Sequence, residues 1–139
     1  SFHYDRLYTQ QKIQAGASFV ITQLMFDVRE YFDLVEYLNS LGIMVPVIPG
    51  ILPVPSLESL RRTLSMCGAN LPAKLFFQLE EIQAQEGAEA VKEAGTIFAI
   101  QQCAKLLEGG APGVHLYTLN RAETCLRIVD ELRKRGLLP

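Results

Sequence analysis

The sequence contains no tryptophan and has only three cysteines and two histidines among its 139 residues. The cysteines, Cys67, Cys103 and Cys125, lie far apart, and no two of them form a CxxC pair. His3 and His115 are also distant from each other, and neither has further candidate metal ligands beside it. This spacing excludes a zinc-finger pattern and does not predict a disulfide framework. It indicates reduced, half-buried thiols in a cytoplasmic protein.

An excess of charge of either sign is also missing. The chain carries 13 Lys and Arg against 15 Asp and Glu, a net charge of −2. This balance supplies no basic field for nucleic acid and no acidic tail. No apolar run approaches the roughly 20 residues that span a bilayer, so we expect no membrane contact. The first residues, SFHYDRLYTQQK, lack the apolar segment of a signal peptide. They also lack an initiator methionine, which we interpret as a processed or truncated start.

Hydrophobic residues make up 49% of the chain, enough for one domain with a core. Segments rich in apolar and β-branched residues predict strands at 18–25, 43–51 and 113–119. The middle segment does not alternate, which is typical of a strand covered on both faces, although Pro46 and Pro49 lack a ladder donor. Helical patterns are predicted over these ranges: 5–15, 27–41, 57–66, 72–81, 86–108 and 120–135. The alternation predicts an α/β fold with a parallel sheet.

Capping patterns predict where several helices begin. Asp27 is the expected N-cap of the helix over 27–41, with Glu30 at the capping-box position. Asn120 and Glu123 repeat this pattern at the last helix, and Ser56 can cap the helix over 57–66. Two residues occupy the hydrophobic-staple positions around the first of these starts: Phe26 and Tyr31.

Two predicted strands end in polar residues, and ligands bind at the carboxyl ends of strands in parallel α/β folds. Gln23 interrupts the apolar run FVITQLMF, and its planar amide offers one acceptor and one donor group. That pair matches the edge of a pterin, a purine or a nicotinamide carboxamide, but it can equally bond neighbouring backbone or Arg121. Arg121 can bind a carboxylate or phosphate, or it can simply begin a helix with its head group in water.

Three segments together carry a family resemblance. KIQAGASFVITQLMFD, PVIPGILPV and HLYTLNRAE resemble, in order, the later part of the flavin-binding catalytic barrel of methylenetetrahydrofolate reductase. The similarity runs from about Asp5 to about Leu132, which is nearly the whole chain. The patterns are specific in combination, whereas each alone is weak.

The resemblance implies that residues 1–139 are the C-terminal segment of a single catalytic domain, a (β/α)8 TIM barrel, and supply roughly its last three strand–helix units. In that family FAD receives hydride from NAD(P)H and passes it to 5,10-methylenetetrahydrofolate, giving 5-methyltetrahydrofolate for methionine biosynthesis. A whole barrel takes about 250 residues. The family's catalytic carboxylate and most of its flavin contacts lie in earlier strands, so this segment would need the N-terminal half of the barrel as a partner. A homo-oligomer is also expected.

The resemblance assigns roles to particular residues. Gln23 matches the glutamine that hydrogen-bonds the pterin or the stacked nicotinamide, and Arg121 matches a folate-contacting arginine. Leu119 is expected beside the bound ligand. Three residues on the first helix match flavin-contacting positions: Asp5, Tyr8 and Lys12.

The chain also departs from the bacterial-type pattern. Ser59 and Thr63 stand where those members carry a ligand-contacting glutamine and a stacking phenylalanine. Two other interpretations therefore stay open. One is a non-catalytic, truncated half-barrel that acts as a binding or interaction module. The other is a different TIM-barrel enzyme that uses Arg121 to bind phosphate.

Overall fold

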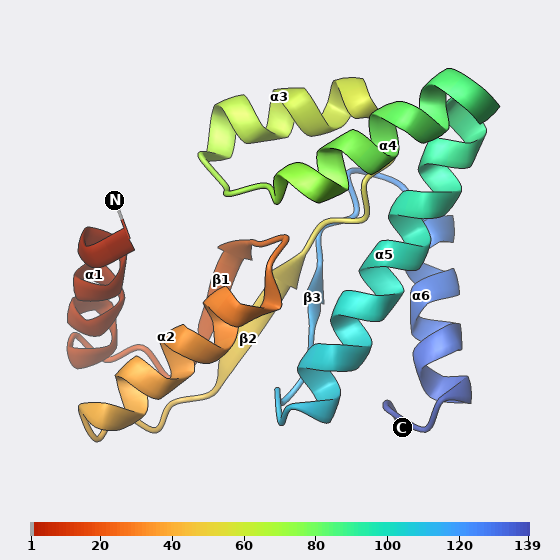
Figure 1. Cartoon of the computed structure of the whole chain (residues 1–139). Coiled ribbons are helices and arrows are strands. Elements are labelled where there is room, and N and C mark those ends of the chain that lie inside the picture. The colour runs from red at the N-terminus through yellow and green to blue at the C-terminus, as the bar shows by residue number, and fades with distance from the viewer. Residues whose placement is uncertain (1) are drawn as a thin grey trace.

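The computed structural model describes residues 2–139, and the side chains from Asp5 onward. Three strands form one parallel sheet in the order β1-β2-β3, which confirms the predicted α/β class (Figure 1). The elements, in chain order, are α1 Phe2–Gln14, β1 Val20–Leu24, α2 Val28–Ser40, β2 Val47–Ile51, α3 Leu57–Cys67, α4 Ala73–Glu86, α5 Ala88–Glu108, β3 His115–Leu116 and α6 Ala122–Lys134.

The helices lie where predicted, although α1 begins earlier, at Phe2, and α4 ends later, at Glu86. All three strands are shorter than predicted: β1 covers only Val20–Leu24 of 18–25, and β2 covers only Val47–Ile51 of 43–51. The third strand is the shortest. It was expected over 113–119, whereas β3 covers only His115–Leu116. The Tyr117 N–H still donates to the Ile51 carbonyl at 2.9 Å. Leu119 and Asn120 then adopt φ angles of 47° and 63°. These left-handed conformations turn the chain away from the sheet, and strand pairing ends there.

One hydrophobic core lies between the sheet and three helices. Buried residues of α2, α5 and α6 pack together with residues of β2. In Figure 1 these helices lie along the strands, while α3 and α4 lie beyond the end to which the β2 arrowhead points. The core residues common to this layer include Tyr31, Leu38, Ile51, Cys103, Ile128 and Leu132.

A second core forms beyond the carboxyl end of β2. Leu52 and Val54, which follow β2, pack there with apolar residues of α3 and α4 and with Val91 of α5. Gly95 of α5 permits this approach, because a Cβ atom at that position would overlap the Val54 carbonyl oxygen. The α3–α4 pair is thus fixed over the end of the sheet where ligands bind in parallel α/β folds.

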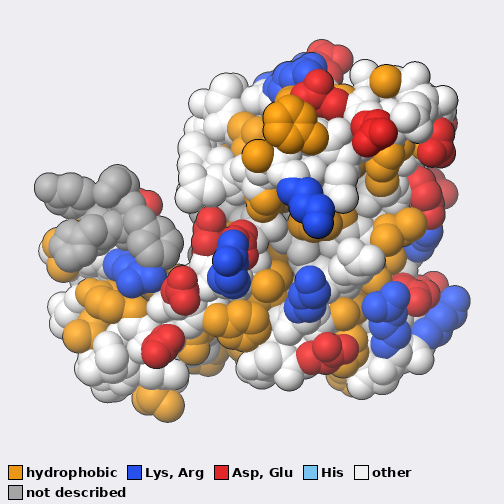
Figure 2. All heavy atoms as spheres, in the orientation of Figure 1, with side chains coloured by type: hydrophobic (Ala, Val, Ile, Leu, Met, Phe, Trp, Pro, Cys, Tyr) orange, Lys and Arg blue, Asp and Glu red, His pale blue; other side chains and the backbone are white. Residues whose placement is uncertain are grey.

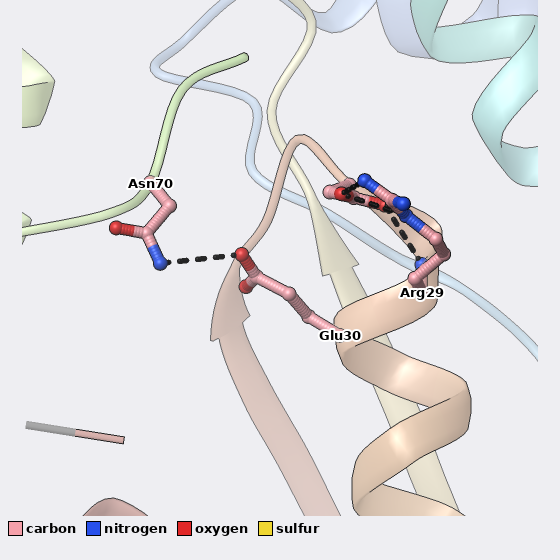
Figure 3. A network of polar contacts seen from close by, with 4 residues as sticks. Arg29, Glu30 and Asn70 are labelled. Carbon is pink, nitrogen blue, oxygen red and sulfur yellow. Dashed lines mark hydrogen bonds and ion pairs between the residues drawn. The ribbon is translucent and has the colours of Figure 1, made fainter.

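The start of α2 follows the prediction at Asp27 but not at Glu30. The Asp27 carboxylate accepts from the Arg29 backbone N–H at 3.0 Å and pairs with the Arg29 guanidinium at 2.7 Å. Glu30, predicted to complete a capping box, instead accepts from the Asn70 amide at 3.4 Å (Figure 3). Burial raises the pKa of Glu30, although its bond with Asn70 acts in the opposite direction.

The predicted hydrophobic staple is also wrong, because its two members pack in different cores: Phe26 in the second and Tyr31 in the first. Two further predictions concern helix starts. Ser56 caps α3 as predicted, with its Oγ accepting from the Ser59 N–H at 3.1 Å. The N-cap of α6 is Arg121 and not Asn120, and no side-chain hydrogen bond caps it. Asn120 tolerates the left-handed conformation and uses that property in the turn.

The thiols are free in the described structure. Cys67 and Cys125 are half-buried as predicted, but Cys103 is fully buried in the first core. Desolvation raises the pKa of Cys103 to about 12, so this thiol stays protonated and unreactive. The side chain of His3 lies outside the described residues. Within the described part of the chain, no group of three or more His, Cys, Asp or Glu residues could hold a metal ion.

The surface carries mixed charge. Figure 2 shows basic and acidic side chains interspersed over the visible face, with hydrophobic side chains between them. This mixture of charges agrees with the net charge of −2. Among the described helices, none is both long enough and apolar enough to cross a membrane.

Candidate functional site

A β-bulge places Gln23 at the end of β1. Ile21 pairs with Ile48 and Leu24 pairs with Gly50, so two residues of β1 face one residue of β2. That one residue is Pro49, which has no N–H to donate to a neighbouring strand. The bulge therefore forms where the regular ladder could not continue.

Hydrogen bonds that involve Thr22 replace the ladder hydrogen bonds that are missing at the bulge. The Gly50 N–H donates to Thr22 Oγ1 at 2.9 Å, and the Thr22 hydroxyl donates to the Gln23 carbonyl at 2.8 Å. The Tyr117 hydroxyl, from just beyond β3, donates to the Thr22 carbonyl at 3.1 Å. The carboxyl ends of all three strands are thereby connected around one short bulge.

The Gln23 side chain is exposed at this bulge, and its amide reaches a neighbouring helix. Nε2 donates to the carbonyl of Cys67, the last residue of α3, at 3.0 Å. The alternation of β1 accounts for this exposure, because Ile21 and Gln23 are exposed while the residues between and beside them are half-buried. The amide thus lies on the surface between the end of β1 and the end of α3.

A small hollow lies beside the ends of β2 and β3. Its volume is about 10 Å³, room for about one water molecule. Leu119 and Arg121 both line it. Lys92 and Thr96 from α5 also line it. Two cations and several hydroxyl groups around one hollow suit an anionic or polar ligand group.

A second, larger groove adjoins this hollow between α5 and α6. Its volume is about 130 Å³, and Lys92, Thr96 and Thr124 line both spaces. Arg127 and Glu93 form a two-bonded ion pair along it, at 2.5 and 2.6 Å. This pairing lowers the pKa of Glu93. The Arg127 guanidinium is therefore engaged within the protein, whereas Lys92 lies at the junction of the two spaces.

The residues matched to flavin contacts lie on α1. Asp5, Tyr8 and Lys12 are exposed, and their spacing of three and four residues places them on one helix face. Ile13 packs α1 against the first core, and Arg6 stacks over the Tyr37 ring at 5.3 Å. The exposed face is therefore held on a helix that is attached to the sheet layer.

The structure brings some of the predicted site residues together and leaves others apart. Leu119 and Arg121 share the hollow, but Gln23 does not line it. Ser59 and Thr63 lie half-buried on α3, whose last carbonyl binds Gln23. These positions share one feature: they all lie at or beyond the carboxyl ends of the strands.

Two residues at the site were not predicted from the sequence. Lys92 lines both hollows but lies in a long helix, where a lysine usually marks a solvated face. Tyr117 lies within the motif HLYTLNRAE, yet its contact with Thr22 depends on strand register across 95 positions of sequence. Pro49 within a predicted strand was the one available signal of an irregular pairing.

Comparison with known proteins gives consistent results. The methylenetetrahydrofolate reductase family model matches residues 1–133. A probable methylenetetrahydrofolate reductase (NADPH) of Caenorhabditis elegans is 37% identical over 95% of this chain, which corresponds to 20% of that protein. The 5,10-methylenetetrahydrofolate reductase of Escherichia coli is 34% identical over 94% of this chain and 44% of its own length. The chain therefore spans between about one fifth and less than half of these relatives.

A solved structure supports the fold. An uncharacterized protein from Clostridium thermocellum, which binds two copies of 5-methyl-5,6,7,8-tetrahydrofolic acid, superposes with a TM-score of 0.65 at 18% identity. The similarity covers 93% of this chain and 48% of that protein. At this level of identity the likeness concerns the arrangement of helices and strands.

Proposed function

Because the chain belongs to the methylenetetrahydrofolate reductase family, we propose that it forms the last strand–helix units of a (β/α)8 barrel that reduces 5,10-methylenetetrahydrofolate to 5-methyltetrahydrofolate. NAD(P)H would supply the electrons and FAD would carry the hydride. In this proposal the 139 residues contribute substrate and cofactor contacts. The catalytic acid and most flavin contacts come from the remainder of the barrel, in a cytoplasmic enzyme.

The observation that carries this proposal is the position of Gln23. A glutamine in an apolar strand would ordinarily be costly unless its amide were satisfied. Here the alternation of β1 leaves the amide exposed at the carboxyl end of the strand, beside the bulge opposite Pro49. An amide there can exchange its bond with Cys67 for a donor–acceptor pair on a pterin, because the contact with Cys67 is itself exposed.

The hollow supports a second contact with the same substrate. Leu119 offers an exposed apolar side chain, and Arg121 offers a forked donor group that suits a carboxylate. A reduced folate has a flat ring system at one end and carboxylates at the other. Gln23 would bind the ring. Leu119 and Arg121 would contact a more distant part of the molecule from the rim of the hollow, because the hollow itself has room for only about one water molecule.

The residues present on α1 fit part of a flavin site. Lys12 can pair with a pyrophosphate, Asp5 can accept hydrogen bonds, and Tyr8 presents an exposed ring, and all three lie on one accessible face. They are too few to enclose a dinucleotide, so other parts of the barrel would complete the site. The flavin, when bound, supplies hydride transfer, whereas these side chains hold and orient it.

The experiment uses the intact native polypeptide. Purified protein should show the absorbance of bound flavin and should oxidise reduced nicotinamide when methylenetetrahydrofolate is added. Comparing NADH with NADPH then identifies the electron donor. A colourless protein without folate-dependent oxidation would contradict the proposal and favour the non-catalytic binding module.

The same preparation tests the phosphate-binding alternative. That alternative predicts tight binding of a phosphate ester through Arg121 without flavin. Calorimetric titration with inorganic phosphate and with 5-methyltetrahydrofolate separates the two. We expect heat of binding with the folate and none with phosphate at the same concentration.

A further inference from the structure

The side chain of Tyr117 connects the two parts of the proposed site. Its hydroxyl donates to the Thr22 carbonyl at 3.1 Å, across the width of β2. Tyr117 also lines the hollow that contains Leu119 and Arg121. One residue after β3 therefore contacts both the bulge beside Gln23 and the wall of the hollow.

Close packing fixes the Tyr117 ring in this position. A Cβ atom on Gly50 would lie 2.7 Å from Tyr117 Cε2 and 2.7 Å from the Thr22 carbonyl oxygen. The absence of a side chain at Gly50 thus lets the ring cross β2 and reach β1. The His115 ring packs edge-on against Tyr117, with the centroids 4.7 Å apart. The tyrosine is held from both sides before any ligand binds.

Both peptide units that flank Gln23 are held by hydrogen bonds. The Thr22 carbonyl belongs to the planar peptide unit that ends at the Gln23 nitrogen, and the Tyr117 hydroxyl binds this carbonyl. The Gln23 carbonyl belongs to the next unit, and the Thr22 hydroxyl binds it at 2.8 Å. Fixing these two units restricts φ and ψ of Gln23, and so fixes the direction in which its side chain leaves the backbone.

From this geometry we infer that Tyr117 is a positioning residue for Gln23. Its hydroxyl holds the bulge in the conformation that presents the Gln23 amide to the folate ring, and this inference rests on the function proposed above. A β-bulge lacks some of the regular ladder hydrogen bonds, so its backbone can change conformation when a further hydrogen bond is lost. Removal of the hydroxyl should therefore loosen substrate binding through Gln23, while the flavin contacts of α1 are unaffected.

The test compares Tyr117→Phe with Tyr31→Phe in the intact flavoprotein. Tyr31 is a matched control because its hydroxyl also donates to a strand carbonyl, that of Val47 at 2.9 Å, but at the amino end of β2. We expect Tyr117→Phe to raise the KM for methylenetetrahydrofolate by about three- to tenfold, the effect of one neutral hydrogen bond. Flavin content should not change, and Tyr31→Phe should keep the wild-type KM.

A double-mutant cycle separates positioning from a general loss of stability. In a Gln23→Ala background, Tyr117→Phe should no longer change the KM, because the group that it positions is absent. An unchanged KM in the single variant, or an equal further increase in the Gln23→Ala background, would overturn the inference.

Hydrogen exchange of the Gly50 amide gives a readout that does not need activity. This N–H donates to Thr22 Oγ1, so it reports on the bulge directly. It should exchange faster in Tyr117→Phe than in wild type or Tyr31→Phe, and equal rates would overturn the inference. If the wild-type protein neither binds flavin nor turns over folate, the proposed function fails. The Gly50 exchange rate still decides the role of Tyr117.

Discussion

At the scale of single residues, hydrogen bonds with neighbouring backbone groups set the directions in which the polar side chains at the strand ends point. The sequence identifies Gln23 as unusual, since an amide inside an apolar run needs a partner. It cannot identify that partner, the Cys67 carbonyl, which lies 44 positions away. The need for a hydrogen-bond partner can be predicted from the sequence, whereas the identity of that partner depends on tertiary packing and cannot.

Replacing Gln23 tests its proposed contact with the substrate. We expect Gln23→Ala to retain flavin and to lower kcat/KM for methylenetetrahydrofolate, because hydrogen bonds of about 1–3 kcal/mol are lost. Steady-state kinetics and the flavin absorbance of the purified variant measure the two effects. Gln78→Ala, at an exposed glutamine of α4, is the control and should behave as wild type. Loss of flavin with unchanged folate kinetics would reverse the assignment.

Replacing Lys12 tests its proposed contact with the flavin. Lys12→Ala should weaken flavin binding by about tenfold, because a charge-assisted bond to a phosphate is lost. The flavin dissociation constant, measured by fluorescence after dilution, reports the change. Lys105→Ala removes an exposed lysine near the end of α5 and should leave that constant unchanged. Equal flavin dissociation constants for wild type and Lys12→Ala would contradict the proposal that α1 forms part of the cofactor site.

At the scale of elements, helix ends and apolar periodicity were predictable because they depend on neighbours in sequence. Asp27 and Ser56 cap helices as predicted. The prediction fails at Asn120, where the same residue type serves a left-handed turn, and at β3, where pairing stops after two residues. In both cases the course of the chain between β3 and α6, set by packing, overrides the local preference.

The N-cap of α2 gives a pH-dependent prediction. The Arg29 guanidinium lowers the pKa of Asp27 below its ordinary 3.8, so the ionised carboxylate stabilises the folded state. This contribution is complete above the ordinary pKa and is lost as the pH falls through the lowered value. Asp27→Ala should reduce the free energy of unfolding by about 1 kcal/mol at neutral pH. The deficit should shrink in strong acid.

Urea denaturation at neutral pH and in strong acid measures this difference. Asp27→Asn is the matched control, since asparagine caps helices about as well as aspartate but does not titrate. At neutral pH it should lie between Asp27→Ala and wild type, because it keeps the capping hydrogen bond but lacks the charge that pairs with Arg29, and it should approach wild type in strong acid. A deficit for Asp27→Ala that is the same at both pH values would show that the charge of Asp27 makes no contribution.

The contact between α5 and the segment after β2 gives a second prediction at this scale. Gly95→Ala should lower the free energy of unfolding by about 1–3 kcal/mol, because its Cβ would overlap the Val54 carbonyl oxygen and displace the helix. Gly113→Ala is the control, because a Cβ there meets no atom within 4 Å. Urea denaturation of both variants provides the comparison. Equal stability would mean that α5 can shift without loss.

At the scale of the whole molecule, the chain supplies three adjacent parallel strands, and residues at the carboxyl ends of β1 and β3 carry the proposed folate contacts. The family could be predicted from ordered motifs over nearly the whole chain, and the α/β class from the alternation of strand and helix patterns. The relative placement of Gln23 and Arg121 could not, because it depends on the bulge opposite Pro49 and on the turn at Leu119 and Asn120. Both irregularities arise where regular pairing fails, and both adjoin the proposed site.

The proposed binding of one folate molecule by residues at the ends of β1 and β3 can be tested directly. Calorimetric titration of the intact native polypeptide with 5-methyltetrahydrofolate compares wild type with Gln23→Ala and Arg121→Ala. The account predicts that each substitution raises the dissociation constant, by about tenfold, because each removes a contact with the same ligand. Wild-type affinity in either variant would contradict it.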